Sequence, residues 1–187
     1  MTLTVLTPPG EEALPLAEAK AFLRIGHDGE DVLVADLAAG ARARLEEAAG
    51  LALVTRTLRR TYYAWPTSVM RRGIALRPGP AASLTGVRTV DAGEAATDHT
   101  DRFQLAAGRL CLRPGAALPS LSSGSRVEID FVSGFGAASE IPDDLVHALK
   151  LILLDAYRRN GEVGLPQEAK AIIAARRGLS AVEHDVE

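Results

Sequence analysis

The sequence has 187 residues, 47% hydrophobic and 24% charged, a composition that excludes a disordered chain and suits one folded domain with a good core. Its single cysteine, Cys111, excludes an internal disulfide framework and a cysteine-based zinc site, and no apolar run reaches the roughly 18 residues that a membrane helix needs. No signal peptide is recognisable, so we expect synthesis in the cytoplasm and no membrane partner.

The net charge of −3 is unevenly distributed. Residues 48–90 contain seven arginines and no acidic residue, whereas residues 1–47 and 91–187 each carry a net charge of −5. A basic segment between acidic flanks is compatible with nucleic-acid contact, with docking on an acidic partner, and with a solvated sheet face balanced by acidic helices. Eighteen of the 21 basic residues are arginine, a side chain suited to ion pairs at interfaces.

The first quarter of the chain predicts an extended arm followed by two helices. Residues 1–15 contain Thr7-Pro8-Pro9-Gly10, which favours an arm and a turn over a packed element. Residues 16–24 have the apolar spacing of a short helix. Residues 31–49 have the spacing of a longer helix, which is expected to close at Gly50.

The middle of the chain changes to the period of two that is typical of strands. Many β-branched and aromatic residues make 54–63 a long strand that ends before Pro66. Further strands are predicted at 73–77, 84–90, 103–105 and 109–112. The stretch from 91 to 103 shows no clear hairpin pattern. Together these residues predict a small antiparallel sheet, over about 53–132, inserted between helices.

The segment from Val127 to Arg159 is the strongest signal in the sequence. Residues 127–132 alternate as a strand does, Gly134-Phe-Gly136 breaks the period, and Pro142 opens the longest apolar helix. The two glycines superficially suggest a nucleotide-binding loop, but the third glycine of that pattern is missing and no β–α–β units precede it. We therefore interpret them as a tight turn.

Two leucines of this long helix lie off its main apolar stripe. Leu151 and Leu154 fall on the opposite side of the helix, among charged residues. One interpretation is that a loop or the C-terminal segment covers them. The other is a contact with another subunit, because a buried leucine is worth about 1.5–3 kcal/mol relative to an exposed one.

The C-terminal part of the chain predicts one more helix and a tail. Leu165-Pro166 signals a helix start, and Gly178 is expected to end the helix. Residues 179–187 are acidic and are expected to form a flexible tail or a segment ordered by a partner. The predicted fold class is α+β. It comprises two N-terminal helices within 16–49, a long C-terminal helix within 142–177 and the inserted sheet, in a single domain over residues 1–178.

No arrangement of side chains predicts catalysis, a cofactor or a metal site. The four histidines are scattered, and none pairs with another at metal-ligand spacing. No Gly-x-Ser-x-Gly elbow is present, and Cys111 lies in an apolar strand, where a structural role is far more common than a nucleophilic one. Asp143 and Asp144 are explained by the positive end of a helix dipole. We therefore expect a protein that is not an enzyme.

The order and spacing of eight motifs carry a family resemblance over about residues 5–175. The motifs are Leu16-Ala-Glu-Ala-Lys-Ala-Phe-Leu-Arg24, Leu53-Val-Thr-Arg-Thr-Leu-Arg59, Ala64-Trp-Pro66, Leu76-Arg-Pro78, Leu84-Thr-Gly-Val-Arg-Thr-Val-Asp91, Val127-Glu-Ile-Asp-Phe-Val-Ser-Gly-Phe-Gly136, Ile141-Pro-Asp-Asp-Leu-Val-His-Ala-Leu-Lys150 and Tyr157-Arg-Arg159. In this combination the sequence resembles the head–tail connector, or adaptor, proteins of long-tailed bacteriophages and of phage-derived gene transfer agents.

The resemblance implies a structural adaptor at the head–tail junction of a phage or gene transfer agent particle. The implied assembly is a ring of twelve copies, seated beneath the portal protein and extending the DNA channel toward the tail. Its implied partners are the portal protein, the tail-side stopper or next connector protein, and further copies of itself. DNA would pass through the channel without specific binding. In similar adaptors a C-terminal segment anchors the ring to the portal.

A ring needs two different, complementary patches on each subunit. The basic sheet segment is one candidate patch, and the acidic helices with Leu151 and Leu154 are the other. The residues predicted to contact a subunit or a partner are Arg56, Arg59, Arg60, Arg71, Arg72, Leu151, Leu154, Arg176 and Arg177. The alternative function is a nucleic-acid-binding module that uses the basic segment 56–88.

Overall fold

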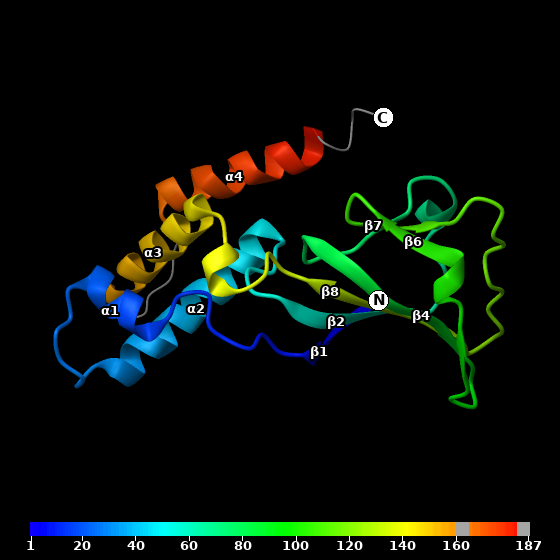
Figure 1. Ribbon diagram of the computed structural model, residues 1–187, viewed down its shortest axis with the longest axis horizontal. Helices are drawn as coiled ribbons and strands as arrows, with labels where there is room; N and C mark the ends of the chain where they lie inside the picture. Colours follow the sequence, from blue (N-terminus) through cyan, green and yellow to red (C-terminus); the bar gives the residue numbers. More distant parts are fainter. Residues whose placement is uncertain (160–164, 183–187) are drawn as a thin grey trace. The chain divides into compact units, whose positions relative to one another are not determined.

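The chain folds into two compact units, each built from segments that are distant in the sequence. The computed structural model describes residues 1–159 and 165–182, with side chains described through Arg176. The sheet unit combines Met1–Gly10 with Thr55–Gly134, and the helical unit combines Glu11–Val54 with Phe135–Glu187 (Figure 1). The unit boundaries near residues 54 and 134 follow the changes between helical and strand periodicity in the sequence.

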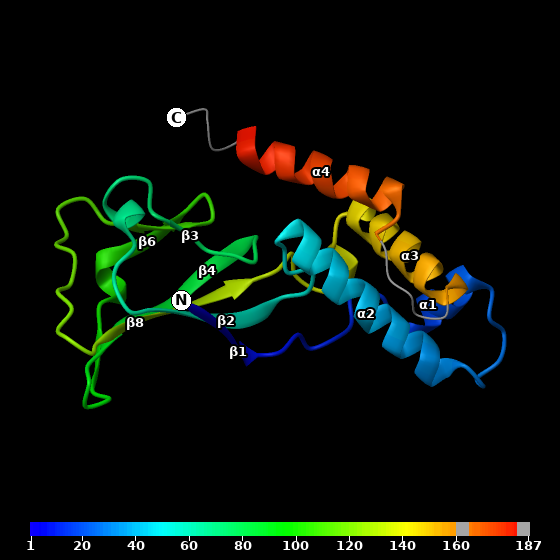
Figure 2. The ribbon, with the colours of Figure 1, turned by 180° about the vertical axis from the view of Figure 1, so that it is seen from behind.

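The described part of the helical unit contains four α-helices. They are α1 (Leu16–Leu23), α2 (Asp31–Ala49), α3 (Asp143–Arg158) and α4 (Gln167–Val182). α2 and α3 lie side by side, and α4 packs against both (Figures 1 and 2). Gly50 ends α2 in the left-handed conformation at φ 67°, and Pro142 immediately precedes the first turn of α3. The predicted end of α2 and start of α3 are confirmed.

The apolar stripes of α2 and α3 form most of the helical core. The buried side chains on these helices include Val34, Ala38, Ala41, Leu45, Leu145, Leu149, Ile152 and Leu153. α4 adds Ala169 and Ile173, one helical turn apart. Each large aliphatic side chain buried here stabilises the unit by about 1.5–3 kcal/mol. The predicted core face of α3 is confirmed.

α4 is longer than the sequence predicted. It begins at Gln167 and continues through Gly178 to Val182, so the predicted helix end at Gly178 is wrong. A glycine inside a helix costs about 1 kcal/mol relative to alanine, which weakens a helix without necessarily ending it. Residues 183–187 of the predicted tail lie outside the described residues.

The sheet unit contains two antiparallel sheets. The larger has the strand order β1 (Thr2–Thr7), β2 (Arg56–Tyr62), β8 (Arg126–Ser133), β4 (Ala81–Val90) and β5 (Ala96–Asp98). The smaller has the order β3 (Ile74–Ala75), β7 (Arg109–Leu112) and β6 (Phe103–Ala106). Two short 3-10 helices, η1 (Thr67–Met70) and η2 (Thr100–Arg102), precede β3 and β6. The smaller sheet lies over one face of the larger, where β6 contacts β4 (Figures 1 and 2).

The second apolar core lies between these two sheets. The central strand β8 contributes Val127, Ile129 and Phe131, all fully buried, and the smaller sheet contributes Phe103 and Leu110. The ring of Trp65 stacks on Phe103 with centroids 5.3 Å apart. Because side chains alternate along a strand, the residues between these on β8 point to the opposite face of the larger sheet.

The β structure is larger than the small inserted sheet that the sequence predicted. Residues 2–7, expected as an unpacked arm, form β1 and pair with β2. Residues 96–98, in the stretch without a clear hairpin pattern, pair with the end of β4. Local sequence patterns did not identify either strand. The partner of β1 lies some 55 residues away in the sequence, and β5 has only three residues. The mixed class of helices and antiparallel sheet is confirmed, and the single domain over residues 1–178 stays a prediction.

Candidate subunit and partner interface

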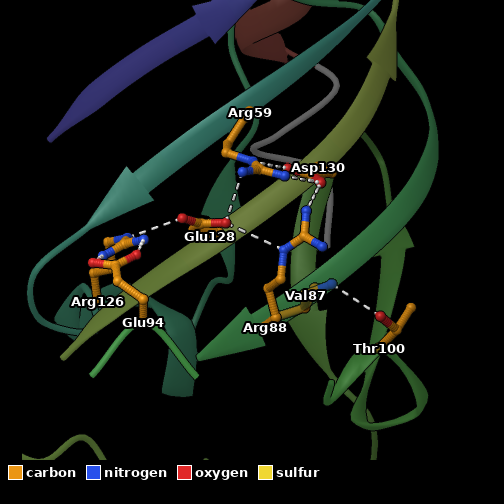
Figure 3. A network of polar contacts seen from close by, with 8 residues as sticks. All are labelled: Arg59, Val87, Arg88, Glu94, Thr100, Arg126, Glu128 and Asp130. Carbon is orange, nitrogen blue, oxygen red and sulfur yellow. Dashed lines mark hydrogen bonds and ion pairs between the residues drawn. The ribbon is translucent and has the colours of Figure 1, made fainter. Parts of the chain in front are cut away.

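The polar face of the larger sheet carries a cluster of charged side chains (Figure 3). Glu128 and Asp130 alternate with Ile129 on β8, so they point away from the apolar core. Cross-strand pairing places Arg59 of β2 opposite Asp130 and Arg88 of β4 opposite Glu128. The strand register therefore brings two arginines from distant parts of the sequence onto two neighbouring carboxylates.

The guanidinium of Arg59 forms the most complete contact in this network. Its Nε donates to Asp130 Oδ1 at 2.7 Å and its Nη2 donates to Asp130 Oδ2 at 2.9 Å, while Nη1 lies 2.8 Å from Glu128 Oε2. Arg88 donates from Nε to the same Glu128 oxygen at 3.2 Å, and from Nη2 to Asp130 Oδ2. Both carboxylates thus bridge two strands, one on each side of β8.

Arg126 extends the network to a third carboxylate. Its Nε donates to Glu128 Oε1 at 2.9 Å, and Nη1 donates to Glu94 Oε1 at 2.8 Å. The hydrogen bonds that Arg126 donates to Glu94 and Glu128 raise the pKa of Arg126, and the bond from Arg126 lowers the pKa of Glu94. The bond to Asp130 likewise raises the pKa of Arg59. Three guanidiniums face three carboxylates, so the network is balanced in charge.

The remaining arginines predicted at an interface do not join this network. Arg60 lies on the other face of β2 and donates from Nη2 to the carbonyl of Arg77 at 2.7 Å. Arg56 begins β2 opposite Ser133, is half-buried and interacts within the chain. Arg71 and Arg72 follow η1 and are exposed. The five predicted arginines are therefore spread over four places in the sheet unit and do not form one continuous patch.

A basic residue that sequence reasoning missed lies beside Arg72. The side chain of Arg109, on β7, donates to the carbonyls of Arg72 and Gly73, the latter at 3.0 Å. Gly73 has φ +70°, and a Cβ there would lie 2.7 Å from both Cys111 Sγ and the Leu110 carbonyl oxygen. Only glycine fits such a close approach, which holds the end of η1 against β7. An isolated arginine after a predicted turn offered no signal of this proximity.

The two units carry opposite net charges. The sheet unit has eleven arginines and six acidic residues, a net charge of +5, whereas the helical unit has ten basic and eighteen acidic residues, a net charge of −8. The balanced network contributes nothing to the +5. The excess positive charge of the sheet unit therefore comes from arginines outside the network, including the group at Arg71, Arg72 and Arg109.

The leucines predicted to form a second patch on α3 are half-buried. Leu151 and Leu154 lie outside both apolar cores as these are formed by the described residues. Their role as a contact surface stays a prediction.

An ion pair holds the C-terminal helix against its neighbour. Arg176 of α4 donates from Nε to Asp144 Oδ2 at 2.7 Å and from Nη2 to Oδ1 at 2.5 Å. The bond to Asp144 raises the pKa of Arg176, and the same bond lowers the pKa of Asp144. Arg176, predicted at an interface, therefore has a partner inside the helical unit. The side chain of Arg177 lies outside the described residues.

Residues 1–159 and 165–182, which the structure describes, contain neither a metal-binding cluster nor a membrane-spanning helix. Within this part of the chain, no group of three or more histidine, cysteine, aspartate or glutamate side chains could hold a metal ion. None of its helices combines the length and the apolar character needed to cross a membrane.

Solved structures that contain similar chains are of gene transfer agent particles. No known family profile and no curated protein sequence matches this chain. A chain in the neck of an empty GTA particle, computed with C6 symmetry, matches with a TM-score of 0.81 and 32% identity, over 94% of this chain and 95% of that chain. A chain in the virion of a native gene transfer agent (GTA) particle matches with a TM-score of 0.79 and 33% identity, over 94% of both chains. A chain in the neck of a native GTA particle, computed with C12 symmetry, gives 0.75 and 32%, also over 94% of both chains.

Proposed function

The chain belongs to the family of head–tail connector proteins of gene transfer agent particles, and we propose that it forms an adaptor ring between the portal vertex and the tail machinery. In this role it is a structural protein of the neck. The observation that supports the proposal best is the likeness to neck chains over nearly the whole length of both partners, at 32% identity. A fold shared by chance would not preserve a third of the residues across two units.

We propose a ring of twelve copies. The neck structures that contain the similar chains have C6 and C12 symmetry, and a ring of twelve identical subunits is compatible with both. Rings form from heterologous contacts, in which two different patches on each subunit meet. The opposite net charges of the sheet unit and the helical unit, +5 and −8, supply two such unlike surfaces.

The proposed ring extends a channel through which DNA passes without specific binding. Each phosphate neutralised by a free arginine would add counterion-release affinity and slow the passage of DNA. In the sheet unit, Arg59, Arg88 and Arg126 are already paired with carboxylates. Phosphate binding by these arginines would first have to break those pairs.

The pairing of these arginines with carboxylates also weakens the alternative function, a nucleic-acid-binding module. Arg59 and Arg88 lie in the segment 56–88 on which that alternative depends, and both are bound within the balanced network. The alternative predicts tight, salt-dependent DNA binding by the isolated protein, which the adaptor function does not require.

The proposed partners are the portal protein on one side and a stopper or next connector protein on the tail side. We propose that the C-terminal segment anchors the ring to the portal. α4 is held to the helical unit by Ala169, Ile173 and the ion pair of Arg176, so the chain that follows starts from a fixed position. Truncation after Gly178 is expected to leave the fold intact and to reduce copurification with the portal protein. Unchanged copurification would remove the anchor from the proposal.

Deletion of the gene in the producing cell tests the adaptor function directly. We expect DNA-filled or empty heads without tails, counted by electron microscopy, and restoration of tailed particles by a plasmid copy. Normal numbers of tailed particles without the protein would refute the proposal. Coexpression with the portal protein, followed by imaging of purified portals, is expected to show a ring of this chain attached to them.

A further inference from the structure

We infer that the lateral contact of the ring joins the outer face of α2 in one copy to the basic patch of the next copy. The outer face of α2 comprises Val32, Asp36, Gly40, Ala43 and Glu47. The basic patch comprises Met70, Arg71, Arg72 and Arg109. This inference rests on the proposed function, because it requires that copies of the chain form a ring.

The outer face of α2 lies opposite the helical core. The buried residues of α2 repeat from Val34 to Ala49, and Asp36, Ala43 and Glu47 point the other way and are exposed. No described side chain forms a hydrogen bond or ion pair with Asp36 or Glu47, whereas Arg42, on the flank of α2, is paired with Glu12 and Glu46. The charge on this face is therefore negative and free to bind a cation.

Two further features of α2 indicate a covered surface. Val32 is 77% exposed, although it is a β-branched aliphatic side chain at the start of a helix. Gly40 lies in mid-helix, and a Cβ built there meets nothing within 4 Å. Glycine costs about 1 kcal/mol relative to alanine at such a position, and packing within the described chain gives no reason for it. Close approach of another chain to α2 at this position would explain why residue 40 is a glycine.

The basic patch has the matching properties with the opposite charge. Arg71 and Arg72 are exposed, and no described side chain forms an ion pair with either. Arg109 lies alongside, held by the carbonyls of Arg72 and Gly73. Met70, 64% exposed, supplies an adaptable apolar side chain next to the charges. Arginine and methionine are both enriched at protein interfaces.

The signs of charge select the geometry of the contact. Two outer faces of α2 repel each other, and so do two basic patches, so a symmetric pairing of like surfaces is disfavoured. Pairing of unlike surfaces is head-to-tail, and a head-to-tail contact gives a ring when the rotation between neighbouring copies divides a full turn. The occupant of the outer face of α2 is therefore a second copy of this chain.

Two variants with reversed charge test the contact. The acidic-face variant is Asp36→Arg with Glu47→Arg, and the basic-patch variant is Arg71→Glu with Arg72→Glu. In a ring of either variant alone every lateral contact opposes like charges. In a mixture, the now positive outer face of α2 in the acidic-face variant can meet the now negative patch of the basic-patch variant. The unchanged negative outer face of the basic-patch variant can meet the unchanged basic patch of the acidic-face variant. The two variants therefore fit alternately around a ring with an even number of copies.

The assay is the number of adaptor copies on portal rings after coexpression, measured by imaging and native mass spectrometry. We expect each variant alone to weaken the lateral contact about tenfold or more, equivalent to about 1.4 kcal/mol, and to leave few complete rings. The two variants expressed together are expected to restore complete rings. Complete rings from either variant alone, or no restoration in the mixture when both variants melt like the wild type, would overturn the inference.

Two controls separate this contact from other effects. Asp101→Arg with Glu168→Arg changes the net charge as much as the acidic-face variant does, at exposed positions on η2 and α4 that belong to neither surface, and is expected to form complete rings. Gly40→Leu is expected to raise the melting temperature, because leucine is the better helix former, and yet to block assembly sterically. Complete rings from Gly40→Leu would contradict the inference. If the wild type forms no ring on the portal, the proposed function fails instead.

Discussion

Asp130→Asn tests whether the network on the polar face of the larger sheet stabilises the sheet unit. The Asp130 side chain is 11% exposed and accepts hydrogen bonds from Arg59 and Arg88, on the two strands that flank β8. Asparagine has nearly the same shape, so the substitution removes the charge and one acceptor oxygen without leaving a cavity.

The magnitude follows from how far the network is buried. Removal of one partner from a fully buried ion pair costs about 3–5 kcal/mol, and removal of an exposed one less than about 1 kcal/mol. The Arg59 and Arg88 side chains are 26% and 35% exposed, so water partly replaces the lost carboxylate. We therefore expect Asp130→Asn to lower the free energy of unfolding by about 2 kcal/mol.

Urea unfolding followed by tryptophan fluorescence measures this loss. Trp65 is the only tryptophan of the chain and stacks on Phe103 in the core of the sheet unit, so its signal reports on that unit. Glu94→Gln is the matched control, because Glu94 accepts from Arg126 at the exposed end of the same network, with 70% of its side chain exposed. We expect Glu94→Gln to shift the midpoint much less than Asp130→Asn does. Equal midpoints for the two variants would refute the argument that burial makes the network stabilising.

Two further predictions concern the helical unit. Leu151→Glu with Leu154→Glu is expected to leave the circular dichroism signal of the helices unchanged and to weaken assembly on the portal, because both leucines lie outside the described cores. If the variant unfolds, the two leucines belong to the core instead. The pKa of Asp144 is lowered in the folded state by Arg176, so the ion pair stabilises the docking of α4 above the unfolded pKa of about 3.9 and this contribution is lost as the pH falls through the folded value. The protection factors of the α4 amides, which correct for the intrinsic pH dependence of amide exchange, are expected to fall over that acidic range in the wild type and not in Asp144→Asn. Identical pH profiles of the protection factors would contradict the role of the pair.

Local sequence signals were sufficient to predict α2, the start of α3 and the central strand β8. α2 was predicted at residues 31–49 and observed at Asp31–Ala49, because apolar spacing and the glycine that follows are local signals. The alternation of residues 127–132 and the proline before α3 were equally readable. The motifs that carried the family resemblance lie mostly on these elements, which is why the neck-protein family was recognisable before any comparison with solved structures.

Which strands pair and which charges meet depends on contacts between residues that are far apart in the chain. β1 and β5 depend on partners that hydrogen bonding between strands selects, and no local period encodes that choice. Arg59 appeared as a free basic residue in the sequence and is bound to Asp130, 71 residues away, because the register of β2 and β8 sets them opposite each other. The sequence specifies how much charge each segment carries. Only the fold specifies which charges are neutralised within the unit and which are left for a partner, since ion pairing depends on distances of a few ångströms that sequence separation does not report.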